Sequence, residues 1–81
     1  MRLDKFLKVS RIVKRRTVAN EMAAAGRVEV NGKRAKPGTD VKAGDILAIG
    51  YGEKLIRVRI LHVREYAKKE EASSLYEVLT G

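Results

Sequence analysis

The dipeptide Asn31-Gly32 is the strongest local constraint on how this chain folds. Val28 and Val30 alternate with charged residues just before it, and a second short segment, residues 33–36, follows it. Asn-Gly is the preferred pair for a two-residue type I′ turn, in which both central residues need a positive φ. The sequence therefore predicts a β-hairpin at residues 28–36, closed by Pro37-Gly38.

Two short helices are predicted before this hairpin. Leu3, Phe6 and Leu7 lie on one face at helical spacing, which predicts an amphipathic helix at residues 2–9. A second helix is expected at residues 17–25, with the Thr17 hydroxyl as its N-terminal cap and Gly26 as the left-handed residue that ends it. Neither helix is long enough to be stable in isolation, so both must pack on something.

Further strands are expected after the hairpin. Residues 46–49 form a short apolar run, and residues 55–63 alternate between apolar and charged side chains. Residues 64–72 are too highly charged to assign, and the spacing of Leu75, Tyr76 and Leu79 fits either a short C-terminal helix or a frayed tail. The order of elements predicts an α+β domain in which two N-terminal helices pack on one side of a small antiparallel sheet.

The positive charge is concentrated in one half of the chain. The 81 residues carry a formal net charge of +8. Residues 1–42 hold 12 basic and 4 acidic side chains, whereas residues 43–81 hold 6 of each, so the whole excess belongs to the first half. Such asymmetry indicates a polyanionic partner. The absence of Cys and of any long apolar run predicts a single soluble domain without disulfides.

The candidate binding residues come from the two helices, their connection and the hairpin. We expect phosphate contacts from Arg2, Lys8, Arg11, Lys14, Arg15, Arg16, Thr17, Lys33, Arg34 and Lys36. The sequence places no two aromatic residues in a pattern typical of a base-stacking platform, so we expect recognition of folded RNA through its backbone. Asp4 is expected to pair with a cation near the first helix, such as Lys8 at i+4.

Catalytic chemistry has no candidate residues here. The chain has one His, no Cys and no Gly-rich phosphate loop, so we expect no enzyme activity, no cofactor and no metal site.

Two other classes of function stay open: a DNA-binding helix-turn-helix protein and a general ribosome or protein interaction module. The helix at 17–25 offers only Asn20 and Glu21 for reading bases, which argues against DNA recognition.

An ordered set of motifs resembles a known family. Its elements are a basic residue and Thr opening the second helix (Arg16-Thr17), the segment Gly26 to Gly32 ending in Asn-Gly, and Val41 followed by Gly44-Asp45. This set, within residues 2–49, resembles the RNA-binding domain of ribosomal protein S-four and its alpha-L motif. The opening residues 1–11 and the segment 68–72 are similar to the RqcP (YabO) family of ribosome-associated quality-control factors, which is related to the heat-shock-protein-fifteen group.

The resemblance implies a function and a set of partners. It implies binding to large-subunit ribosomal RNA and to peptidyl-tRNA on stalled large subunits, with an RqcH-type factor, during alanine tailing. We accordingly expect an S-four-like core at residues 2–49, an additional strand within 50–66 and a C-terminal segment at 67–81. We also expect a cytoplasmic, ribosome-associated monomer with no membrane contact.

Overall fold

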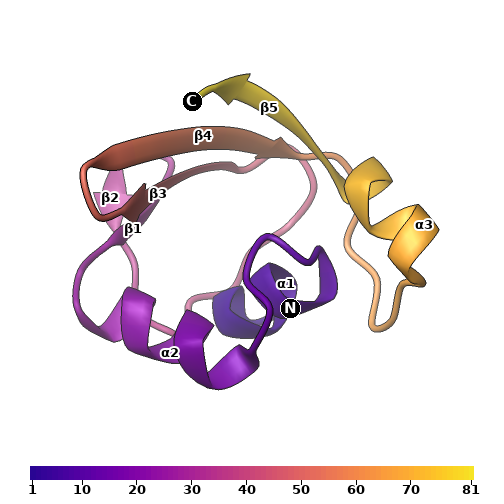
Figure 1. Ribbon diagram of the computed structural model, residues 1–81, viewed down its shortest axis with the longest axis horizontal. Helices are drawn as coiled ribbons and strands as arrows, with labels where there is room; N and C mark the ends of the chain where they lie inside the picture. The colour runs from indigo at the N-terminus through magenta and orange to yellow at the C-terminus, as the bar shows by residue number, and fades with distance from the viewer.

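The computed structural model describes residues 1–81 as two helices packed against one face of a five-stranded antiparallel sheet (Figure 1). The chain runs α1 (Leu3–Val9), α2 (Arg16–Ala24), β1 (Val28–Val30), β2 (Lys33–Arg34), β3 (Ile46–Tyr51), β4 (Lys54–Ile60), α3 (Lys69–Ala72), a single 3₁₀ turn (Ser73–Leu75) and β5 (Tyr76–Thr80). The strand order is β2-β1-β3-β4-β5. The predicted α+β class and the placement of the helices on one side are confirmed.

The core lies between the two N-terminal helices and the inner face of the sheet. Leu3, Phe6 and Leu7 of α1 are fully buried, as the helical spacing predicted. They meet Leu47 and Ile49 of β3, which alternate with more exposed neighbours because successive strand residues point to opposite faces. The fully buried side chains of α2 are small, Ala19 and Ala23, so this helix packs close to α1, and the partly buried Met22 also packs against the core.

The predicted hairpin forms as expected. Asn31 and Gly32 have φ values of 52° and 83°, the left-handed conformations that a type I′ turn requires. Strand β2 is shorter than the predicted segment 33–36, since only Lys33 and Arg34 pair with β1. Gly26 ends α2 with a φ of 78°, also as predicted.

The C-terminal prediction was wrong in one respect. Residues 76–80 form strand β5 rather than a helix or a frayed tail, and the short helix α3 lies earlier, at Lys69–Ala72. Tyr76 pairs with Ile60 and Val78 pairs with Val58, so the edge of β4 provides backbone partners that an isolated helical turn would lack. Strand pairing with a distant segment thus overrides a local helical spacing.

Strand β4 ends at Ile60, three residues before the predicted end of the 55–63 strand. The backbone N–H groups of Leu61 and His62 both donate to the carbonyl of Leu75, at 2.8 and 3.2 Å, which draws the chain away from the sheet. His62 is therefore exposed and lies outside the strand. No helix in the structure has the length and apolar character needed to cross a membrane.

Candidate nucleic-acid interface

A buried carboxylate, Asp4, lies at the centre of the candidate interface. It is 2% exposed and sits where α1 meets α2. Its oxygens accept hydrogen bonds from Arg2 Nε and Nη2 at 3.2 Å each, from Arg16 Nη2 at 3.4 Å and from Asn20 Nδ2 at 3.3 Å. One side chain therefore orients two arginines and holds α2 against α1.

The environment keeps Asp4 ionised. Burial is the largest single influence and would raise the pKa of the carboxyl group. The hydrogen bonds from Asn20 and Arg2, together with the charges of Arg16 and Arg2, outweigh it and lower the pKa of Asp4 below its ordinary value. The carboxylate is therefore charged at neutral pH and binds both guanidinium groups.

The two arginines bound by Asp4 are only partly covered. The side chains of Arg2 and Arg16 are 54% and 47% exposed. A guanidinium carries five N–H donors, so each retains free donors after its bonds to Asp4. Asp4 pairs with a cation beside α1, as expected, but that cation is Arg2 and not Lys8, which is exposed and makes no ion pair.

The connection between α1 and α2 presents further cations. Val13 is buried, and the Tyr51 hydroxyl donates to the Ile12 carbonyl at 2.7 Å, so the middle of this connection is anchored to the core. Arg11, Lys14 and Arg15 are exposed and make no ion pair. We call Arg2, Lys8, Arg11, Lys14, Arg15 and Arg16, together with Thr17, the N-terminal basic group.

Thr17 does not cap α2. The helix begins one residue earlier than predicted, with Arg15 in the N-cap position at φ −126° and ψ 137°, and no side chain caps it. Thr17 lies in the first turn and is exposed. The backbone N–H groups of this first turn thus have no side-chain acceptor from the protein. The positive end of the α2 helix dipole lies in the same region as Arg15 and Arg16.

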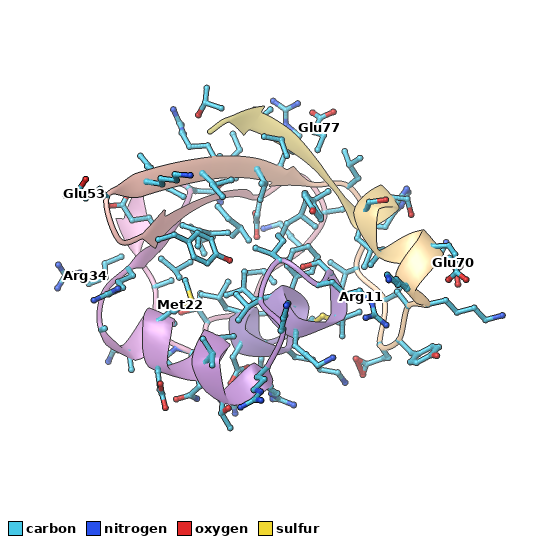
Figure 2. The ribbon with its side chains drawn as sticks, in the orientation of Figure 1. Arg11, Met22, Arg34, Glu53, Glu70 and Glu77 are labelled. Atoms are coloured by element: carbon cyan, nitrogen blue, oxygen red, sulfur yellow. The ribbon has the colours of Figure 1, made fainter.

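The hairpin residues form a second set of exposed cations, the hairpin group of Lys33, Arg34 and Lys36. Figure 2 places Arg34 and Arg11 far apart, towards opposite ends of the molecule. Lys36 lies nearer the helices, because the following residue, Pro37, accepts a hydrogen bond from the Asp4 backbone N–H at 3.1 Å. The ten candidate residues are therefore spread along an extended surface and do not form one compact cluster.

A second buried carboxylate, Asp45, fixes the hairpin. It accepts hydrogen bonds from Asn31 Nδ2 at 3.1 Å and from the Lys42 backbone N–H at 2.9 Å. Burial would raise the pKa of Asp45, but these hydrogen bonds and the Lys42 charge lower it. Asn31 Oδ1 in turn accepts from the Ile46 backbone N–H at 2.9 Å. The Gly44-Asp45 segment and the Asn-Gly turn are thus held together by these hydrogen bonds.

Asp4 and Asn20 were not among the predicted site residues, although both position residues that were. The signal available in the sequence was an acidic residue on the apolar face of an otherwise basic helix. The residues present include no cluster of three or more His, Asp or Glu side chains that could bind a metal ion.

The sequence and the fold agree with known proteins. The family model described as "S4 domain" matches residues 1–47, and the chain belongs to this S4 domain family, within its group of ribosome-associated quality-control (RQC) P-site tRNA stabilizing factors. A protein named RQC P-site tRNA stabilizing factor from Halalkalibacterium halodurans is 62% identical, over 96% of this chain and 89% of the relative. The protein of the same name from Bacillus subtilis is 52% identical, over 98% of this chain and 92% of the relative.

A solved structure supports the same assignment. The trimeric structure of heat shock protein 15 from Vibrio cholerae has a TM-score of 0.89 and 33% identity to this chain, covering 96% of this chain and 80% of that one. The expected relationship to the S-four domain and to the heat-shock-protein-fifteen group is confirmed, and with it the class of RNA-binding and translation quality-control proteins.

Proposed function

We propose that this chain is a non-enzymatic factor that binds peptidyl-tRNA and large-subunit ribosomal RNA on stalled large ribosomal subunits. The observation that carries the proposal is the pair of half-exposed guanidinium groups, Arg2 and Arg16, oriented by the buried Asp4 beside unpaired cations. The names of the relatives, RQC P-site tRNA stabilizing factors, support the tRNA part of this assignment.

Binding is through phosphates in this proposal. The guanidinium groups of the N-terminal basic group contact phosphate oxygens in forked pairs, and the lysines act as point charges. Thr17 and the uncapped N–H groups at the start of α2 donate to a phosphate at the same end of the helix. Lys33, Arg34 and Lys36 extend the contact along the RNA backbone.

The proposed location and partners are those implied by the family resemblance. We propose that the factor acts in the cytoplasm, bound to the ribosome as a monomer, and that it works with an RqcH-type factor during alanine tailing of the stalled chain. The S-four-like core at residues 2–49 then binds RNA, while the additional strand within 50–66 and the segment at 67–81 complete the domain.

Co-sedimentation with large ribosomal subunits that carry peptidyl-tRNA tests this function. If about six phosphates are neutralised, the logarithm of the affinity falls with the logarithm of salt concentration at a slope of about −5. Affinity then drops about a thousandfold between 50 and 200 mM salt. Failure to pellet with these subunits at 50 mM salt would contradict the proposal.

Two double variants distinguish the effect of the N-terminal basic group from the effect of net charge. Lys14→Ala with Arg15→Ala removes two unpaired cations next to α2 and should flatten the salt slope by about one to two units. Arg57→Ala with Lys69→Ala removes the same charge from exposed residues elsewhere and should leave the slope nearly unchanged. Equal effects of the two variants would mean that only net charge matters. Equal competition by duplex DNA would favour the helix-turn-helix alternative.

A further inference from the structure

A groove with a volume of about 400 Å³ lies between the α1–α2 connection and the inner face of the sheet. Tyr51 of β3, Ile56 of β4 and Tyr76 of β5 line one side, and Arg11 and Ile12 of the connection line the other. The helices do not cover this part of the sheet, and Val78 on the floor of the groove is 62% exposed. The volume falls in the range of sites that take small organic ligands, about 300–1,000 Å³.

Two tyrosine residues that are 25 positions apart in sequence line this groove. Both are half-buried and packed against the core. The hydrogen bond from the Tyr51 hydroxyl to the Ile12 carbonyl, at 2.7 Å, fixes one ring. Burial and, after it, the neighbouring Tyr76 raise the pKa of Tyr51, so its hydroxyl stays protonated and remains a donor at neutral pH.

The charged residues of the groove are both cationic. Arg11 and Lys54 line it, are exposed and make no ion pair. No carboxylate lines it. Arg11 has a φ of 62°, an uncommon conformation for a residue other than glycine, which ends α1 and starts the wall of the groove. Aromatic faces flanked by unpaired cations are the combination that binds an unpaired nucleotide, because the base stacks and the phosphates meet the cations.

We propose that this groove binds one unstacked base of an RNA whose backbone is held by the N-terminal basic group. The inference rests on the proposed function, because Arg11 belongs to both surfaces. Tyr76 supplies the stacking face, Tyr51 forms the closed end of the groove, and Arg11 and Lys54 bind the phosphates on either side of the base. An apolar protein segment would match the floor but would leave both cations without a partner.

The test compares two RNAs of equal length: a hairpin with 2-aminopurine in its unpaired loop, and a blunt duplex. Stacking on the groove should quench 2-aminopurine fluorescence in the hairpin. Tyr76→Leu, which keeps apolar bulk and removes the ring, should weaken hairpin binding at least about fivefold and abolish the quenching. Duplex binding should change less than about twofold. Tyr76→Phe is the matched control, and it should bind and quench like the unchanged protein.

Lys54→Ala provides a second variant at an exposed position, where substitution does not threaten folding. It should weaken hairpin binding about two- to fivefold without altering duplex binding. If Tyr76→Leu and Lys54→Ala both bind the hairpin normally, or if the unchanged protein gives no quenching, the groove proposal is overturned while salt-dependent RNA binding stands. If the unchanged protein binds neither RNA at low salt, the proposed function itself fails.

Discussion

The molecule contains two buried carboxylates, Asp4 in the helix pair and Asp45 at the hairpin, and they serve different ends. Both are at most 5% exposed, and hydrogen bonds lower the pKa of both. Asp4 is bonded only to side chains, including the two guanidinium groups of Arg2 and Arg16. Asp45 is hydrogen-bonded to the Lys42 backbone N–H and to Asn31, which itself holds the backbone of Ile46, and its one ion pair is a longer one, at 3.7 Å, to the exposed Lys42 ammonium.

Asp4 positions charged side chains, whereas Asp45 mainly positions backbone. A carboxylate that fixes backbone contributes to one defined turn, and its loss should affect stability alone. A carboxylate that orients exposed guanidinium groups links stability to binding, because the same hydrogen bonds that hold α2 also orient the phosphate contacts. Variants of the two regions should therefore differ in how far RNA affinity follows the free energy of unfolding.

The largest stability loss is expected at the hairpin, for Asn31→Ala. Alanine at a φ of 52° is strained by about 1–2 kcal/mol, and the hydrogen bonds to Asp45 and Ile46 are lost at about 1 kcal/mol each. The free energy of unfolding should fall by about 3–4 kcal/mol, as measured by urea denaturation. Asn31→Gly relieves the strain and loses the same bonds, so it should be the milder change. Equal losses would mean that strain plays no part.

Asp4→Asn should affect both stability and binding. The neutral amide loses charge-assisted bonds to two guanidinium groups, which should lower the free energy of unfolding by about 1–3 kcal/mol. Arg2 and Arg16 lose their fixed orientation, and ordering each again costs about 0.5–1.5 kcal/mol, so RNA affinity should fall about tenfold. Binding is measured at a temperature at which the variant is fully folded.

Asp45→Asn is the matched control, because it makes the same chemical change at the other buried carboxylate. Its RNA affinity should stay within about twofold of the unchanged protein. Tighter binding by Asp4→Asn would indicate that Asp4 acts only as a repulsive charge near the RNA, and the distinction between the two carboxylates would then fail.

Lowering the pH should reduce the stability that Asp4 and Asp45 both provide. Their pKa values are lower in the folded protein than the ordinary value of about 3.9, so the unfolded chain binds more protons in this range. The stability they provide is complete above about pH 5 and is lost as pH falls through the lowered pKa values. The double variant Asp4→Asn with Asp45→Asn should be less stable at pH 7 and should depend less on pH below 4. Denaturation series at several pH values measure this.

Glu65 provides an internal contrast in the same experiment. Its pKa is also lowered, first by a hydrogen bond from Lys5, but the side chain of Glu65 is exposed. Salt screens an exposed pair much more than a buried one. The pH dependence that survives 0.5 M salt should therefore belong to Asp4 and Asp45, and its complete loss in salt would contradict their assignment.

Features determined by neighbouring residues could be predicted from the sequence, and features determined by distant contacts could not. The Asn31-Gly32 turn, the Gly26 helix end and the buried face of α1 follow from spacing and from residues that tolerate a positive φ. The spacing of Leu75, Tyr76 and Leu79 fitted a short helix or a frayed tail, and only pairing with the free edge of β4 makes the segment a strand.

The same reasoning explains what was missed in the candidate site. The basic residues are visible in the sequence because charge is a local property. The bonds of Arg16 and Asn20 to Asp4 span 12 and 16 positions, and Tyr51 and Tyr76 line one groove although they are 25 positions apart. No spacing rule for a single helix or strand covers such distances.

The smallest effect is expected for the exposed ion pair between Arg59 of β4 and Glu77 of β5. Both side chains are 45% exposed, on the face of the sheet away from the helices. Exposed pairs contribute about 0–1 kcal/mol because water and salt screen them. Arg59→Ala should therefore lower the free energy of unfolding by less than about 1 kcal/mol and leave RNA affinity unchanged. A loss as large as that of Asp4→Asn would show that docking of β5, rather than burial of the carboxylate, determines how much an ion pair stabilises this fold.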